Sequence, residues 1–296
     1  MHTTRLKTSP IFFRVVLIFS ATIQLAATQE FTTSQTETNP TLLWSAGLSV
    51  AGGQRSTSTS ETQPAAFVSA SGSMSRSYSS GLVLGAANVV GWGEFIETER
   101  LMQNSLSGLV QIGSDTTFSI IPQVSVQLLE RNLFSLGSDL TFDLRSYSTF
   151  IYFGASMAVG LYRSLDPMYE YLTGTTRELR GYAGIETIKG LTLGLALTAG
   201  KAAYFGNTTG IEASAGYTIT KNWNLSLNTS LTRWMSEEPV SHSKSINAEI
   251  GYRLNKELSC YVSQYFERND SANSWDPLNE SRSIVGLTLA LGNTNQ

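Results

Sequence analysis

The sequence predicts an all-β protein that forms a transmembrane up-and-down antiparallel β-barrel of about 12–14 strands. Apolar and small polar residues alternate in many segments, each about 10 residues long, and polar connections of alternating short and long length join them. A period of two sends successive side chains to opposite faces of a strand. A tilted strand of about 10 residues crosses the roughly 30 Å hydrocarbon core of a bilayer.

The N-terminal segment, residues 1–27, has the organisation of a secretory signal peptide. Arg5 and Lys7 precede an apolar run, and the small pair Ala26 and Ala27 marks the cleavage site. The alternative is an uncleaved membrane anchor, but Arg14 keeps the apolar run shorter than the ~20 residues of a spanning helix. Residues 28–41 follow as a flexible polar lead-in, residues 42–292 form the barrel, and residues 293–296 form a short tail.

The net charge and the cysteine count limit the partners and the covalent cross-links that the chain can have. Removal of residues 1–27 takes away three basic residues and no acidic one, which lowers the net charge from −3 to −6 and disfavours nucleic acid as a partner. The single cysteine, Cys260, cannot form an intrachain disulfide. Stability must therefore come from packing and hydrogen bonding.

The first half of the predicted barrel contains both clear and weak strands. Gly52–Gln63 and Glu94–Asn104 are predicted as loops, the strands near Leu82 and Leu136 are weak, and Pro122 interrupts a strand because proline removes a ladder donor. The clearer strand segments are Trp44–Val50, Ala66–Met74, Leu106–Ile112, Phe118–Leu128, Leu140–Arg145 and Ile151–Tyr162.

The second half carries the strongest pattern, between Arg177 and Leu254. In Leu191–Ala199 every odd position is apolar, and four neighbouring segments repeat that pattern. Two further strands, Leu258–Phe266 and Arg282–Leu291, complete the barrel. The short turns are Thr187–Gly190, Thr220–Asn222 and Asn255–Glu257, and the long loops are Ser164–Thr176, Met235–Ser243 and Asn269–Glu280. This alternation places both termini of the barrel and all the short turns at one end.

A soluble β-sandwich is the main alternative, but it would show many charged side chains on its polar face. Here that face is mostly Ser, Thr, Gly, Asn and Ala, and so many strands in simple order would leave open edges unless the sheet closed. Aromatic residues on the apolar face gather near the short turns, as an interfacial girdle would. They are Trp44, Tyr217, Trp223 and Tyr252.

Over Leu42–Leu291 the chain resembles bacterial outer-membrane β-barrel proteins, and its size and connections are similar to those of monomeric porins with twelve to fourteen strands. The resemblance is one of pattern, without a family-specific motif. It implies a monomer in the bacterial outer membrane, exported through its signal peptide and in contact with the lipid bilayer.

Charged residues on the predicted inner face are the candidates for function. In a water-filled lumen they would set the selectivity for small hydrophilic solutes, and the loops Ser164–Thr176 and Asn269–Glu280 would narrow the outer mouth. The alternatives are a closed interior in which the charges pair, and a non-conducting surface barrel that is structural or adhesive and acts through its loops. The predicted lumen-lining residues are Asp143, Arg145, Arg180, Glu186, Glu212, Glu249 and Arg253.

No enzymatic activity, cofactor or metal site is predicted. His242 is the single histidine outside the predicted signal peptide and is placed in a polar loop, so the lipid-hydrolase alternative is weak. One histidine and Cys260 do not make a zinc site. The face of the strand on which Cys260 lies is ambiguous from the pattern alone.

Overall fold

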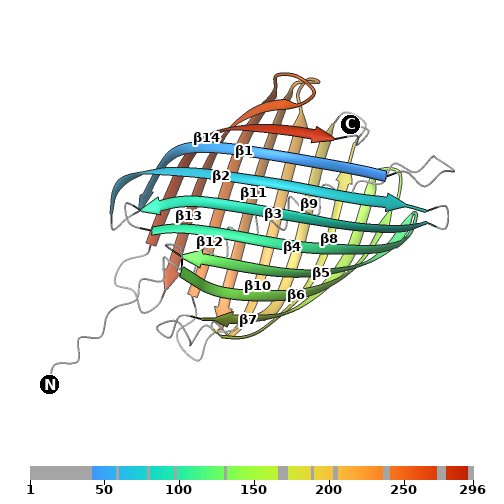
Figure 1. The fold of residues 1–296 in the computed structure, drawn as a ribbon, viewed down its shortest axis with the longest axis horizontal. Helices are drawn as coiled ribbons and strands as arrows, with labels where there is room; N and C mark the ends of the chain where they lie inside the picture. Colours follow the sequence, from blue (N-terminus) through green and yellow to red (C-terminus); the bar gives the residue numbers. More distant parts are fainter. Residues whose placement is uncertain are drawn as a thin grey trace. The chain divides into compact units, whose positions relative to one another are not determined.

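The computed structural model describes residues 42–57, 60–78, 81–96, 99–129, 132–165, 173–187, 190–202, 206–235, 241–271 and 278–292. The predicted signal peptide, lead-in and tail lie outside these residues. Fourteen antiparallel strands form one closed barrel in which each strand pairs with its sequence neighbours and β1 pairs with β14. The prediction of an up-and-down barrel is therefore confirmed (Figure 1).

The strands are β1 (Leu42–Thr57), β2 (Ser60–Ser77), β3 (Leu82–Ile96), β4 (Glu99–Gly113), β5 (Thr116–Leu129), β6 (Asn132–Tyr147), β7 (Ile151–Ser164), β8 (Gly174–Glu186), β9 (Leu191–Ala202), β10 (Gly206–Thr218), β11 (Trp223–Met235), β12 (Ser241–Arg253), β13 (Leu258–Ser271) and β14 (Leu278–Gly292). In Figure 1 the near wall crosses the far wall at a wide angle, as expected when strands are inclined to the barrel axis.

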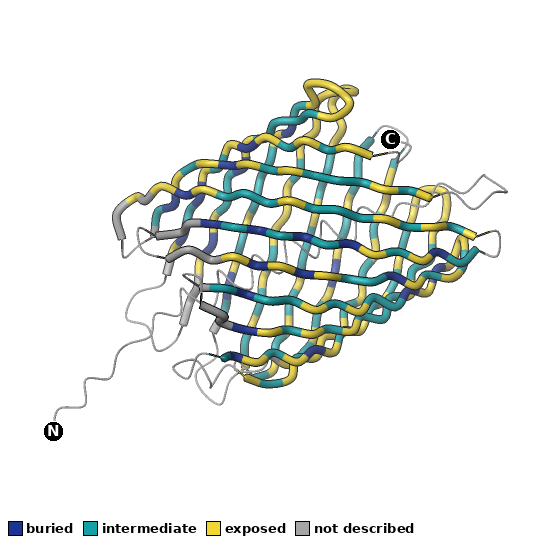
Figure 2. Tube along the Cα trace, in the orientation of Figure 1, coloured by how far each residue is buried: buried dark blue, intermediate teal, exposed yellow. Residues whose placement is uncertain are grey.

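Alternation along each strand separates an outer from an inner face. Directly paired residues share a face, and the apolar set of the strong strands is exposed: Leu195 is 52% and Leu197 56% accessible. Figure 2 shows exposed residues alternating with less exposed ones along the strands. Transmembrane barrels present an apolar outer surface of this kind to lipid. Closure of the sheet gives every backbone N–H and C=O group a hydrogen-bond partner, which lipid cannot supply.

The short turns form as predicted at one end of the barrel, which we call the short-turn end; β1 begins and β14 ends there. Gly190 and Gly113 have φ of +75° and +110°, a conformation that glycine adopts without strain. The Asn255 side chain accepts hydrogen bonds from the backbone N–H groups of Glu257 and Leu258, both at 2.8 Å. The opposite end is called the long-loop end.

Two predicted loops are wrong. Gly52–Gln63 lies largely in β1 and β2, and Glu94–Asn104 lies largely in β3 and β4, while the weak strands near Leu82 and Leu136 are complete members of the barrel. The long loops after β7, β11 and β13 are also shorter than predicted. Gly52–Gln63 is polar on both faces, and in Glu94–Asn104 the apolar residues occur as the adjacent pairs Phe95-Ile96 and Leu101-Met102. Neither segment therefore shows an apolar period of two, although the strands remain hydrogen-bonded.

Pro122 lies inside β5 because the ladder to β4 is interrupted there. The register runs from Ser107 opposite Gln123 to Val110 opposite Ile120, without pairs in between. Gly108 leaves room for the ring, since a Cβ at that glycine would lie 3.3 Å from the proline Cγ. The missing N–H of proline therefore falls where the ladder makes no bond.

Candidate functional site: the inner wall of the barrel

All seven predicted lumen residues lie on the inner face of their strands, each at a position that alternates with exposed apolar residues. Glu186 and Arg253 are exposed at the short-turn end, and Glu249 lies between its paired neighbours Ser226 and Ser263. The other four form two groups, described next.

The first group joins β6 and β8 through a tyrosine. The Arg145 Nε donates to the Tyr182 hydroxyl at 2.9 Å, and that hydroxyl donates to Asp143 Oδ1 at 2.7 Å. Arg145 also donates to the Tyr147 hydroxyl at 2.9 Å, and its guanidinium lies 5.2 Å from the centre of the Tyr182 ring. These contacts fix the guanidinium on the wall, where the Arg145 side chain remains 34% exposed.

The second group is an ion pair between β8 and β10. Arg180 Nη2 and Glu212 Oε2 are 2.7 Å apart, and the pair reaches across β9, where the small residue Ala196 lies. Although both side chains point into the barrel, they are 34% and 45% exposed. The interior therefore contains accessible space next to fixed charges of both signs.

A third group, which the sequence analysis did not identify, joins β1 to β14. Arg55 donates two hydrogen bonds to the two carboxylate oxygens of Glu280, at 2.9 and 3.1 Å, and Arg282 also binds Glu280. The side chains of Arg55 and Glu280 are only 3% and 2% exposed. A bidentate arginine–carboxylate pair of this kind combines charge with fixed geometry.

The same group extends onto β12 and β13. Glu267 accepts hydrogen bonds from Ser243 Oγ at 2.8 Å and from the Tyr265 hydroxyl at 2.7 Å, and Arg282 lies 5.1 Å from the centre of the Tyr265 ring. The predicted loops Gly52–Gln63 and Asn269–Glu280 include Arg55 and Glu280, so the sequence pattern does not predict this group. The signal that could reveal it is the phase of the apolar parts of these strands, because extending the period of two from Trp44–Val50 and from Val285–Leu291 places Arg55 and Glu280 on the inner face.

Charge is distributed unevenly on the wall of the barrel. Among strand residues with described side chains, eight acidic residues and five arginines lie on the inner face. The acidic residues are Asp139, Asp143, Glu178, Glu186, Glu212, Glu249, Glu267 and Glu280. The arginines are Arg55, Arg145, Arg180, Arg253 and Arg282. The inner wall has a net negative charge in this part of the chain.

The four predicted interfacial aromatics lie on the outer face near the short-turn end. Trp44, Tyr217 and Trp223 are exposed. Tyr252 pairs with Trp223 across β11 and β12, with ring centres 4.6 Å apart. Tyrosine and tryptophan at this position suit the boundary between hydrocarbon and water.

His242 is the second residue of β12, paired with Arg233, so its assignment to a loop is wrong. It lies on the outer face, in alternation with Ile246. Cys260 pairs with Tyr252 and Leu287 and lies on the outer face as well. Within the described residues no cluster of three potential metal ligands occurs. A helix long and apolar enough to span a membrane is likewise not found among them.

Comparison with known proteins gives structural similarity only. No family model matches the chain, and no curated protein matches it in sequence. The chain is similar to Pseudomonas aeruginosa OccK10 (OpdN), with a TM-score of 0.49 and 10% identity over 84% of this chain and 99% of that one. It is also similar to Acinetobacter baumannii OccAB4, with a TM-score of 0.47 and 7% identity over 86% and 100% of the two chains. A third similar structure is the outer membrane protein opdK of Pseudomonas aeruginosa. It has a TM-score of 0.45 and 8% identity over 84% of this chain and 99% of that one.

Proposed function

We propose that this protein is a channel of the bacterial outer membrane through which small hydrophilic solutes diffuse passively. The observation that carries the proposal is the Arg180–Glu212 pair, whose side chains point into the barrel and are nevertheless 34% and 45% exposed. Fixed charges beside accessible space attract ions and orient polar solutes as they pass.

The excess of acidic residues on the inner wall predicts a preference for cations. Glu178, Glu212 and Glu249 lie on β8, β10 and β12, which are every second strand of this wall, and they face the same interior. Arg145 and Arg180 lie beside Asp143 and Glu212, with nitrogen-to-oxygen distances of 3.8 and 2.7 Å, so this part of the wall carries charges of both signs. Fixed charges of both signs favour small polar solutes over apolar ones.

The proposal is tested by single-channel recording of the refolded chain, residues 28–296, in a planar bilayer under a salt gradient. We expect discrete conductance steps and a reversal potential on the cation-selective side. Exchanging Glu212→Gln and Glu249→Gln together should move the reversal potential toward anion selectivity, because two interior negative charges are removed.

Glu257→Gln is the matched control, since it removes the same charge from a turn outside the wall. It should leave the reversal potential within error of the unmodified protein. An unchanged reversal potential in the double variant would remove the lumen assignment. A folded barrel that never conducts would instead favour a surface protein that acts through its loops.

A further inference from the structure

The outer face of the barrel carries a basic belt at the long-loop end. Every basic residue of the belt is exposed and lies within four residues of that end of its strand. Among strand residues with described side chains, the acidic ones all lie on the inner face. The belt consists of Arg163, Arg177, Lys201, Arg233, Lys244 and Arg268.

Two pairs of like charges face each other directly within this basic belt. Arg177 is paired with Lys201 across β8 and β9, and Lys244 with Arg268 across β12 and β13. Like charges directly opposite on one face of a sheet repel each other. A bound phosphate can contact both cations of such a pair at once.

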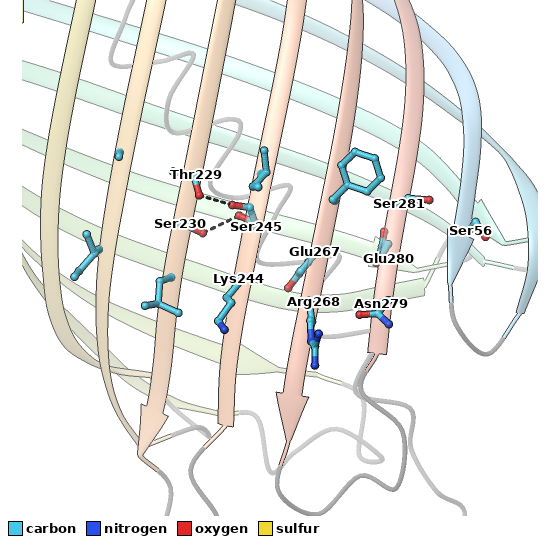
Figure 3. Close-up of a pocket in the computed structure, with 15 residues that line it drawn as sticks. Ser56, Thr229, Ser230, Lys244, Ser245, Glu267, Arg268, Asn279, Glu280 and Ser281 are labelled. Carbon is cyan, nitrogen blue, oxygen red and sulfur yellow. Dashed lines mark hydrogen bonds between the residues drawn. The ribbon is translucent and has the colours of Figure 1, made fainter.

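A hollow of about 840 Å³ lies beside Lys244 and Arg268, and the exposed apolar side chains Ile211, Leu231 and Phe266 also line it. Glu267 and Glu280 contribute to the lining as well, but both are buried on the inner face, where their carboxylates accept hydrogen bonds from Ser243 and Arg55. Figure 3 shows Lys244 and Arg268 on neighbouring strands, with both side chains extending toward the long-loop end. Apolar surface below and positive charge above match a molecule with an acyl chain and an anionic headgroup.

We propose that this hollow binds a phosphorylated lipid of the outer leaflet, with its phosphate on Lys244 and Arg268 and an acyl chain along Ile246 and Phe266. Ile246 and Phe266 are directly paired and are 50% and 52% exposed on the lipid-facing side. Arginine binds phosphate through two parallel N–H groups, and lysine supplies a second point charge. Free phosphate would not use the apolar part of the site.

The test measures lipid binding to the refolded barrel in detergent by native mass spectrometry. Three probes are used: bisphosphorylated lipid A, its dephosphorylated form, and inorganic phosphate. We expect the bisphosphorylated lipid to bind, and Lys244→Gln with Arg268→Gln to weaken it about thirtyfold, the loss expected for two basic residues at an anionic surface. Lys244→Arg with Arg268→Lys should retain binding, because both charges remain.

Arg76→Gln is the matched control, because Arg76 is an exposed outer-face cation near the short-turn end of β2. Its lipid affinity should stay within about twofold of the unmodified protein, since its charge lies at the other interface. Circular dichroism of each variant verifies the folded barrel. Equal affinity of the double Gln variant and the control, equally tight binding of the dephosphorylated lipid, or binding of inorganic phosphate alone would each overturn the proposal.

Discussion

Individual glycines on the inner face determine how tyrosine rings lie against the wall. A Cβ on Gly184 would lie 2.4 Å from the Tyr152 hydroxyl oxygen and 2.5 Å from the backbone oxygen of Leu193. A Cβ on Gly154 would lie 2.5 Å from the Tyr182 hydroxyl oxygen. Part of the space left by small inner residues is therefore filled by aromatic rings of the wall itself.

At this scale we predict that Gly184→Ala lowers the free energy of unfolding by about 1–3 kcal/mol, the usual cost of forcing an extra carbon into a packed site. The measurement is the urea unfolding of the barrel in detergent. Gly181→Ala is the control on the same strand, because its Cβ would meet nothing within 4 Å. Equal unfolding midpoints for the two variants would contradict the proposed contact.

Pairs of strands differ in how their charges are buried. The Arg55–Glu280 pair between β1 and β14 is almost fully enclosed, whereas the Arg180–Glu212 pair reaching across β9 is exposed to the interior. Burial decides the energetic value of each pair, because a charge left unpaired away from water has lost its solvation, whereas an exposed charge keeps it.

We predict that Glu280→Gln destabilises the barrel by about 3–5 kcal/mol, because Arg55 and Arg282 then lose their shared carboxylate. Glu212→Gln, which makes the same change in the exposed pair, should cost at most about 1 kcal/mol. Equilibrium unfolding in urea compares the two. A cost for Glu280→Gln no larger than that for Glu212→Gln would show that enclosure of the pair does not stabilise the β1–β14 seam.

The whole barrel should show a depth-dependent tolerance to charge on its outer face. Leu195 lies near the middle of β9 and Leu254 lies in a short turn, and both are about half exposed. We expect Leu195→Arg to cost about 2–4 kcal/mol and Leu254→Arg at most about 1 kcal/mol, because the first charge meets hydrocarbon and the second meets the interface. Unfolding in lipid vesicles measures both, and similar costs would contradict this placement of the membrane.

Much of this architecture could be predicted because lipid imposes a simple pattern. Where the outer face meets hydrocarbon, as in Leu191–Ala202, apolar residues must alternate with smaller polar ones. Near the long-loop end that requirement ends, so the sequence pattern predicts loops where the outer parts of β1 to β4 continue as strands. Their hydrogen-bonded register, such as Gln54 opposite Pro64, depends on pairing rather than on apolar alternation.

The sequence predicts which charged residues lie on the inner wall, but it does not predict which of them pair. Alternation places Arg180 and Glu212 on the inner face, but it does not show that they meet across β9. Arg55 and Glu280 are 225 positions apart in sequence, and only closure of the sheet brings them together. The direction of a side chain follows from a local period, whereas its partner follows from the register of the complete barrel.

The pairing of β1 with β14 has a consequence for the order of folding. Neighbouring strands can zip together as hairpins, but the last seam joins segments such as Val50 and Leu287 that are far apart in the chain. Until β14 arrives, β1 and β13 remain open edges, which readily pair with other chains. The slow and vulnerable step in folding should therefore be the arrival of the final strand, and a factor that shields these two edges would raise the yield of folded barrel.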